Sequence, residues 1–341
     1  MLIVYSCSAL VLSLDSENNY FYTDFMFQLS TPIAFFIFNR PDLTAKVFEE
    51  IRRSRPLKLF IIADGPRPDH PEDVQKCIDA RRVVDRVDWP CDVRKNFSEV
   101  NLGCQKRIPS GINWVFESAE EAIILEDDCL PDQTFFQFCR ELLEKYRDDP
   151  RIMVVASCNF QYGKNRDYHS YYFSHFSHYS GWATWRRAWK CFDFDMVKWP
   201  DLRDSSWLKD KMLCRNGLKD IWQDDARAVR HWANIFQQTY ENKKNSWGYR
   251  WTFSCWVKEG LIVLPDRNLV KNIGFREDAT HTKEGGSRLT LSIRSMDFPL
   301  KHPPSIVRDI VADRLTQKYH FATSFLLCLK QKIKMFLKTF L

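Results

Sequence analysis

Three adjacent carboxylates are the residues of this chain with the clearest capacity for chemistry. Glu126, Asp127 and Asp128 directly follow an apolar stretch at 122–125. That stretch indicates a buried strand, and ligands of open α/β sheets bind at the carboxyl ends of the strands. Adjacent carboxylates repel one another unless a cation lies between them, and a hard divalent cation that also holds a diphosphate would fill that role. A solvated acidic turn between a strand and a helix is the alternative.

The segments around the acidic run alternate between strand and helix patterns. Strand patterns occur at 33–38, 57–63, 92–96, 122–125, 152–157 and 261–264. Helical spacing occurs at 43–53, 71–87, 108–118 and 135–146. This alternation predicts an α/β fold in which helices flank a parallel sheet.

Polar residues follow three of the predicted strands. Asn39 and Arg40 follow the first strand, Asp64 follows the second, and the acidic run follows the fourth. The carboxyl ends of parallel strands lie at the same edge of a sheet. We therefore expect these side chains to lie in one site.

Composition limits the class of protein and its partners. The chain has 341 residues, enough for one large or two modest domains, and a net charge of +6. That charge is too small to indicate a nucleic-acid partner, but it suits an anionic small ligand. The 11 cysteines form no CxxC pair, so we expect reduced thiols and a cytoplasmic location.

The two ends of the chain differ in character from the middle. Residues 1–30 are expected to form an N-terminal extension, and residues 283–341 a linker followed by a basic amphipathic helix. That helix, from about 321 onward, carries Lys330, Lys332 and Lys334 among apolar residues. It would suit peripheral contact with the inner face of a membrane, or it packs on the domain with its lysines in solvent.

Six motifs in order resemble those of the nucleotide-diphospho-sugar transferases with the GT-A fold. The pieces are FNRP, DG, NLG, ILEDDCLPDQTFFQF, SGWATWRRAW with SWGYRW, and NLVKNIGF with DATHT. They are similar to glycosyltransferase family 2, and the acidic segment resembles that of N-acetylglucosaminyltransferase I. The resemblance implies a Rossmann-like GT-A domain at 31–282. Its nucleotide-sugar-binding half would be 31–160 and its acceptor half 161–282.

The resemblance also implies roles for the acidic run. Asp128 would bind Mn²⁺ or Mg²⁺ directly, and the cation would neutralise the leaving diphosphate as a Lewis acid. Asp127 would act through water or contact the ribose, and Glu126 would orient the other two. His281, in DATHT, would complete the metal site, unless it is a lone surface histidine.

Other residues are implied in donor binding. Asn39 and Arg40 would line the base and phosphate side, and Asp64 would accept a hydrogen bond from the base or ribose, unless it only forms its turn. Asn101 and Gly103 would lie near the nucleotide. The sugar pocket would have Gly181 and Trp182 as its floor, whereas Trp185 and Trp189, at helical spacing, indicate a buried helix face.

The resemblance does not extend to the catalytic base. An inverting transfer needs a carboxylate to take the proton of the acceptor hydroxyl. In N-acetylglucosaminyltransferase I this acid lies in a Trp-Asp-Asp-Trp segment, and the matching segment here has Gly248 and no acid. Asp225, and less so Asp204, are the candidates, although both are equally consistent with solvated helix charges.

Together these features predict a metal-dependent glycosyltransferase, with inversion as the expected stereochemistry. The donor would be a nucleotide-sugar, with a UDP-sugar favoured, and the acceptor a glycan or a lipid-linked saccharide. A sugar-phosphate nucleotidyltransferase is one alternative, but it would need a glycine-rich basic loop after the first strand. A non-catalytic relative that binds nucleotide-sugars and has lost the base is the other.

Overall fold

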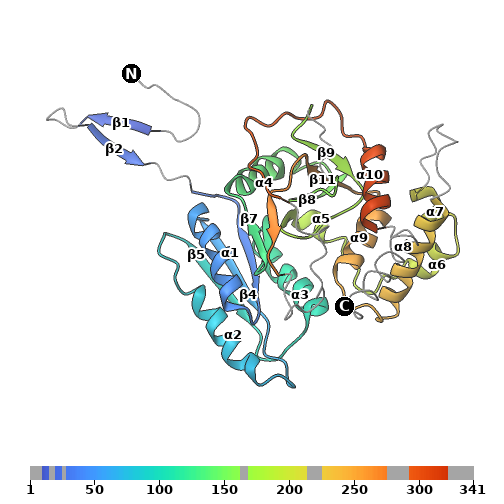
Figure 1. Cartoon of the computed structure of the whole chain (residues 1–341), viewed down its shortest axis with the longest axis horizontal. Helices are drawn as coiled ribbons and strands as arrows, with labels where there is room; N and C mark the ends of the chain where they lie inside the picture. The colour runs from blue at the N-terminus through green and yellow to red at the C-terminus, as the bar shows by residue number, and fades with distance from the viewer. Residues whose placement is uncertain are drawn as a thin grey trace, which may run out of the picture.

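The computed structural model describes residues 10–14, 20–24, 28–161, 168–212, 225–274 and 292–321 (Figure 1). At its centre is an eight-stranded sheet with the order β5-β4-β3-β6-β10-β8-β11-β9. These strands are β3 (Ile33–Ile37), β4 (Lys58–Ala63), β5 (Asp92–Phe97), β6 (Glu121–Glu126), β8 (Ile152–Ala156), β9 (Tyr171–Ser174), β10 (Trp182–Trp185) and β11 (Leu261–Pro265). The predicted strands are all present.

Most neighbouring strands of the sheet run parallel. The pairs β5/β4, β4/β3, β3/β6 and β8/β11 are parallel, whereas β10 is antiparallel to both of its neighbours and β9 is antiparallel to β11. Helices flank the sheet, so the predicted α/β class with a mostly parallel central sheet is confirmed.

Helices connect the strands and cover the sheet. In the first half they are α1 (Pro41–Ser54), α2 (Glu72–Val83), α3 (Cys104–Phe116) and α4 (Gln133–Lys145). In the second half they are α5 (Arg186–Trp189), α6 (Trp199–Arg203), α7 (Trp207–Met212), α8 (Asp225–Tyr240), α9 (Gly248–Val257), α10 (Ile310–Thr316) and a π-helical turn, η1 (Gln317–Phe321). Two small antiparallel pairs complete the fold, β1 (Leu10–Leu14) with β2 (Tyr20–Asp24), and β7 (Cys129–Pro131) with β12 (Val270–Asn272).

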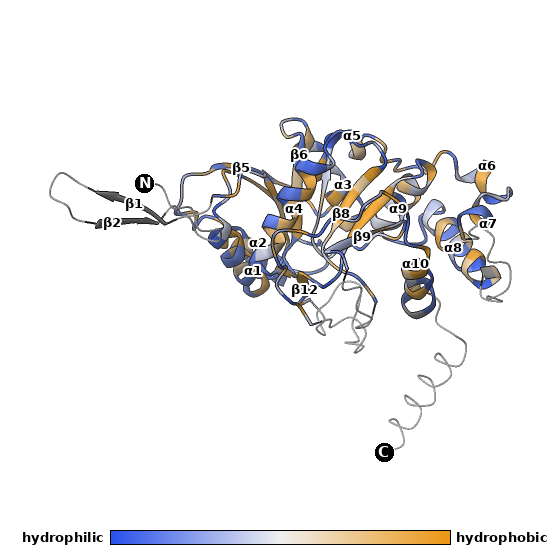
Figure 2. Cartoon of the chain, turned by 90° about the horizontal axis from the view of Figure 1, so that it is seen from above, coloured by the Kyte–Doolittle hydropathy of each residue, from blue (hydrophilic) through white to orange (hydrophobic). Residues whose placement is uncertain are grey.

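The apolar runs form strands because both faces of the sheet are covered. Every residue of β3 and β8 is buried, and α1 packs on the sheet through Val47, Phe48 and Ile51. In Figure 2 the central strands are orange, and blue residues lie on the outward sides of α1 and α2. Each large apolar side chain removed from water in this way stabilises the fold by roughly 1.5–3 kcal/mol.

Aromatic residues build a second core beside the sheet. Phe176, Trp232, Phe236 and Trp256 form its centre, where α6 to α9 meet at the right of Figure 1. The rings of Trp232 and Trp256 lie 4.7 Å apart, and both side chains are almost fully buried. This cluster explains why the chain is rich in aromatic residues between β9 and α9.

The segment after residue 291 corrects the expectation of a free linker from 283 onward. Met296, Leu300 and Ala312 are buried in the main core. Asp313, at 2% exposure, accepts hydrogen bonds from the Ser174 hydroxyl and from the backbone N–H of His175 at 3.3 Å. Residues 292–316 therefore belong to the same folded unit as the sheet.

Several expectations fall on other parts of the chain. The predicted basic helix lies almost entirely in residues 322–341, outside the described residues. A membrane-spanning helix is not found in the part of the chain that the structure describes, where the helices are too short or too polar. The eight cysteines in the described residues are all free thiols.

Candidate functional site

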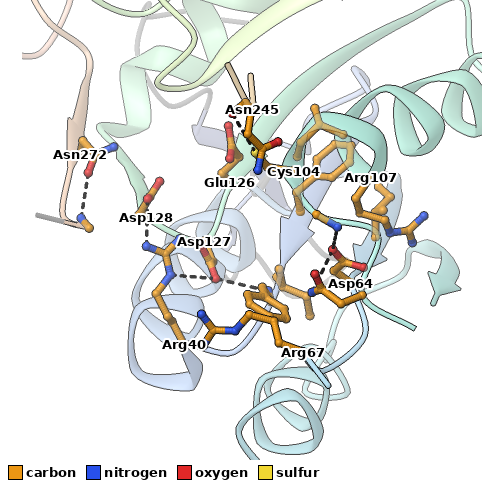
Figure 3. A pocket seen from close by; sticks show the side chains of 18 residues that line it. Arg40, Asp64, Arg67, Cys104, Arg107, Glu126, Asp127, Asp128, Asn245 and Asn272 are labelled. Atoms are coloured by element: carbon orange, nitrogen blue, oxygen red, sulfur yellow. Dashed lines mark hydrogen bonds and ion pairs between the residues drawn. The ribbon is translucent and has the colours of Figure 1, made fainter. Parts of the chain in front are cut away.

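A cavity of about 370 Å³ lies at the edge of the sheet where β3, β4 and β6 end. Figure 3 shows the side chains that line it. The structure brings seven of the predicted site residues to its wall, namely Arg40, Asp64, Asn101, Gly103, Glu126, Asp127 and Asp128. Because β3 lies between β4 and β6, residues that are distant in the sequence meet here.

The cation between the acids is the guanidinium of Arg40. Its Nη1 lies 3.1 Å from Oδ2 of Asp128, and its Nε and Nη2 both donate to the carboxylate of Asp127. The backbone N–H of Phe38 donates to the same Asp127 at 3.3 Å. Burial opposes the charge of Arg40, but the two carboxylates raise its pKa above the ordinary value of arginine.

Glu126 stands apart from this ion-pair network. No hydrogen bond joins its carboxyl to another described residue, and in Figure 3 it lies beside Asn245 and Cys104. The orienting role expected for Glu126 therefore falls to Arg40 and to the backbone of Phe38. Burial, followed by the charges of Asp128 and Asp127, raises the pKa of Glu126 to about 8. The raised pKa favours the protonated form, which can donate a hydrogen bond into the cavity.

Asp64 organises the turn that opens α3. Its carboxylate accepts hydrogen bonds from the backbone N–H groups of Gly65, Leu102 and Gly103, each at 2.9 Å, and one from Asn101 at 3.4 Å. A carboxylate has about four acceptor positions, so these donors occupy all of them. The structure thus gives Asp64 the turn-forming role that the sequence left open, in place of an acceptor for the base or ribose.

The turn held by Asp64 shapes one wall of the cavity. Gly103 has φ of +71°, in the left-handed region that favours glycine, and it is the residue before the first turn of α3. Helix N-termini favour anions because their first N–H groups lack intrahelical partners. Arg107, in the same turn, is committed to the backbone carbonyls of Ala63 and Asn96. The wall is therefore fixed in shape.

Asn39 is turned away from the cavity. Its side-chain N–H donates to Asp73 at 2.6 Å, and it is not among the lining residues. Asp73, buried in the first turn of α2, also holds Arg67 through contacts of 2.6 Å and 3.0 Å. Arg67, which we did not predict, lines the cavity instead. Its position three residues after Asp64, in the same polar turn, was the available signal.

Two further segments that we did not assign reach the cavity. Asn245 comes from the connection between α8 and α9, Asn272 is the last residue of β12, and Gly274 follows β12. A Cβ added to Gly274 would lie 2.5 Å from Oδ2 of Asp128, so only glycine permits this close approach. The NIGF motif was visible in the sequence, but its contact with Asp128 depends on the pairing of β12 with β7.

Gly181 and Trp182 do not line this cavity. Trp182 is 1% exposed within β10, and its ring stacks on that of Trp247 at 5.6 Å. Gly181, at φ +78°, packs against Val270 and Leu125. The structure corrects the expectation of a sugar-pocket floor here, because Trp182 has no free face for a ligand.

The candidates for the catalytic base lie elsewhere. Asp204 is the C-cap residue of α6. Its side chain is 76% exposed, and its carboxylate pairs with Arg203 at 3.0 Å. Asp225 is the first residue of α8. It lies about 22 Å along the helix axis from Tyr240, and the connection that reaches the cavity follows Tyr240. His281, the second predicted metal ligand, lies outside the described residues. The structure brings neither Asp204 nor the backbone of Asp225 to the cavity.

Buried Arg250 holds the cavity segment of Asn245 in place. It is 1% exposed, and its Nη2 donates to the Thr239 carbonyl at 3.0 Å and to Asn242 Oδ1 at 2.7 Å. Its Nη1 donates to the Phe194 carbonyl. Arg250 belongs to the segment that was expected to supply the catalytic acid and has Gly248 there. This segment therefore anchors the connection that carries Asn245 and supplies no carboxylate.

No family model and no curated protein matches this sequence. Among solved structures, the chain is similar to 4-diphosphocytidyl-2C-methyl-D-erythritol synthase from Anaerococcus prevotii DSM 20548. The TM-score is 0.30 at 10% identity, over 63% of this chain and 84% of that one. It is also similar to a putative nucleotide-diphospho-sugar transferase from Desulfovibrio desulfuricans G20, with a TM-score of 0.26 at 13% identity, over 67% and 95%.

A third likeness is to UDP-glucose pyrophosphorylase complexed with UDP-glucose, with a TM-score of 0.23 at 9% identity. It spans 42% of this chain and 62% of that one. Since all three TM-scores are 0.30 or lower, these likenesses carry no argument about the activity of this chain.

Proposed function

We propose that the cavity binds a nucleotide-sugar and that the protein transfers its sugar to a glycan or lipid-linked acceptor. The observation that supports this most is the convergence of Arg40, Asp127 and Asp128 with the first turn of α3 at one sheet edge. A diphosphate matches the helix N-terminus and the guanidinium, and the volume of about 370 Å³ is in the range of small-molecule sites. A UDP-sugar is the favoured donor.

The residues present fit a divalent cation held together with the donor. Within the described residues, no three His, Cys, Asp or Glu side chains form a cluster that would hold a metal by themselves. Mg²⁺ sites in proteins often use only one or two carboxylates plus substrate phosphates. Asp128 has a side chain 19% exposed and lies at the cavity wall, so it is the ligand we propose for Mn²⁺ or Mg²⁺.

The cavity residues then have separate roles in the transfer. The cation, when bound, stabilises the charge that develops on the leaving diphosphate. Asp127 holds Arg40 at the phosphate side, and Gly274 lets the backbone approach Asp128. The bond from the anomeric carbon to the phosphate oxygen breaks, a bond to the acceptor oxygen forms, and the acceptor proton passes to a base that we leave unassigned.

A non-catalytic binding protein is the second candidate. It is favoured by one observation: the carboxylates that line the cavity all belong to the strand tips, and the segment of Gly248 supplies none. Such a protein would bind nucleotide-sugars without turning them over.

Release of nucleoside diphosphate separates the two candidates. We expect the protein with Mn²⁺ to release UDP from at least one UDP-sugar, slowly with water and faster with a suitable oligosaccharide acceptor. Asp128→Asn should lower the rate at least about tenfold, which corresponds to about 1.4 kcal/mol of transition-state stabilisation. Asp201→Asn, a matched change at an exposed site on α6, should leave the rate unchanged. Nucleotide binding without any release from UDP- or GDP-sugars would favour the binding protein.

A further inference from the structure

A second cavity, of about 550 Å³, runs along a different face of α3. On α3 its wall is formed by residues three or four apart, Lys106, Pro109, Ser110, Asn113 and Phe116 with Glu117. The facing wall comes from α5 and the chain after it, with Arg186, Trp189, Lys190, Phe192 and Phe194. We call this cavity the α3–α5 groove. From Lys106 to Glu117 it follows about 16 Å of helix.

Aromatic rings form one side of the α3–α5 groove. The rings of Trp189 and Phe192 stack 4.4 Å apart, and Trp189 donates a hydrogen bond to Asn113 at 2.7 Å across the groove. Phe192 and Phe194 remain partly exposed. Sugar rings present apolar C–H faces between their hydroxyls, and ligand sites that bind them combine aromatic surface with a few polar groups.

The charge of the groove is positive and not balanced. Lys106 and Lys190 are exposed, and within the described residues neither has an ion-pair partner. Arg186 pairs with Glu120 at 2.5 Å, and Glu117 is the one acid among the lining residues. A ligand that complements this wall carries negative charge.

The groove begins at the same end of α3 as the first cavity. Lys106 lines the groove, whereas Cys104 and Arg107, in the same helical turn, line the first cavity. The walls are also joined, because Asn242 accepts hydrogen bonds from Gln105 at 3.2 Å and from Arg250, which in turn donates to the carbonyl of Phe194. An extended ligand that lies in the groove therefore leads toward the proposed donor site.

We infer that the α3–α5 groove binds the acceptor, and that this acceptor is an anionic glycan whose charge is carried by carboxylates or phosphates. Its sugar rings lie on Phe192 and Phe194, and its anionic groups lie near Lys106 and Lys190. The inference rests on the proposed function, since it names the substrate class that the transfer extends.

Calorimetric titration of the full chain with three oligosaccharides tests this inference. Hexagalacturonate carries carboxylates, mannopentaose phosphate carries a phosphate, and maltohexaose is neutral. We expect one charged oligosaccharide to bind at least about tenfold more tightly than maltohexaose, which corresponds to 1.4 kcal/mol. The charged oligosaccharide that binds identifies the anionic group.

Charge-reversal variants locate the binding. Lys106→Glu and Lys190→Glu should each weaken binding of the charged oligosaccharide at least about fivefold, which is about 1 kcal/mol. Lys76→Glu, at an exposed lysine of α2, is the matched control and should change it less than about twofold. The inference is overturned if neither charged oligosaccharide binds the wild type, or if Lys76→Glu weakens binding as much as the groove variants.

Titration of UDP with Mn²⁺ in the same samples distinguishes a failure of the groove inference from a failure of the proposed function. Retained UDP binding with no oligosaccharide binding overturns the groove alone. Failure of both UDP and, in a parallel titration, GDP to bind the wild type overturns the proposed function.

Discussion

Replacement of Arg40 by methionine is expected to lower the free energy of unfolding by about 3 kcal/mol at pH 8, because Asp127 then lies buried without its cation. Asp127 is 2% exposed, and burial raises its pKa to about 6 against the opposing effect of Arg40. Below that pH the folded wild type already holds a proton on Asp127, so the ion pair contributes less and the deficit of the variant shrinks. Urea unfolding at pH 8 and pH 5 measures both values.

Arg53→Met is the matched control for this change. Arg53 lies on α1, is 58% exposed and pairs with Glu50 at 3.1 Å. Exposed ion pairs contribute at most about 1 kcal/mol, so this variant should lose no more than that at either pH. A deficit for Arg40→Met that is equal at both pH values, or no larger than that of Arg53→Met, would contradict the role of Arg40 as the cation between the acids.

Replacement of Arg250 by methionine is expected to lower the free energy of unfolding by about 3 kcal/mol, since it removes a buried guanidinium that donates to two backbone carbonyls. The carbonyls are those of Thr239 and Phe194, and the same side chain holds Asn242. Because Asn242 and Asn245 lie in one short connection, the affinity for UDP should fall as well. Urea unfolding followed by circular dichroism measures the stability, and calorimetry measures the affinity.

Arg230→Met, at an exposed arginine of α8, provides the comparison for Arg250→Met. It removes the same functional group without breaking a buried contact and should cost less than about 0.5 kcal/mol. If the two variants unfold at the same urea concentration, Arg250 does not anchor the connection that carries Asn245.

The inner strands of the parallel half, β3, β4 and β6, were predictable because they are buried on both faces. Stretches such as 33–38 and 57–63 are continuously apolar, and polar turns end them. The strand β10 was not predicted, because Trp182, Trp185 and Trp189 are spaced as on a helix. In the structure Trp182 and Trp185 point to opposite faces of β10, and both are buried because β10 lies inside the sheet.

The candidate site was predictable in its residue types and less so in their contacts. Arg40 and the acidic run were both assigned to it, but their pairing across 87 positions depends on β3 lying beside β6. Asp64 reads as a ligand-binding carboxylate at a strand tip, yet its acceptor positions are filled by backbone N–H groups that a separate turn supplies. Such contacts between strand tips leave no periodic signal in the sequence.

The most direct test of the central claim is calorimetric titration of UDP and GDP, each with and without Mn²⁺, into the wild type and Asp128→Ala. We predict that one nucleotide binds the wild type tightly only with Mn²⁺, and that Asp128→Ala weakens this binding at least about tenfold. Failure of both nucleotides to bind, or binding that depends on neither Mn²⁺ nor Asp128, would contradict the proposed metal-dependent donor site and leave the acidic run as a turn stabilised by Arg40.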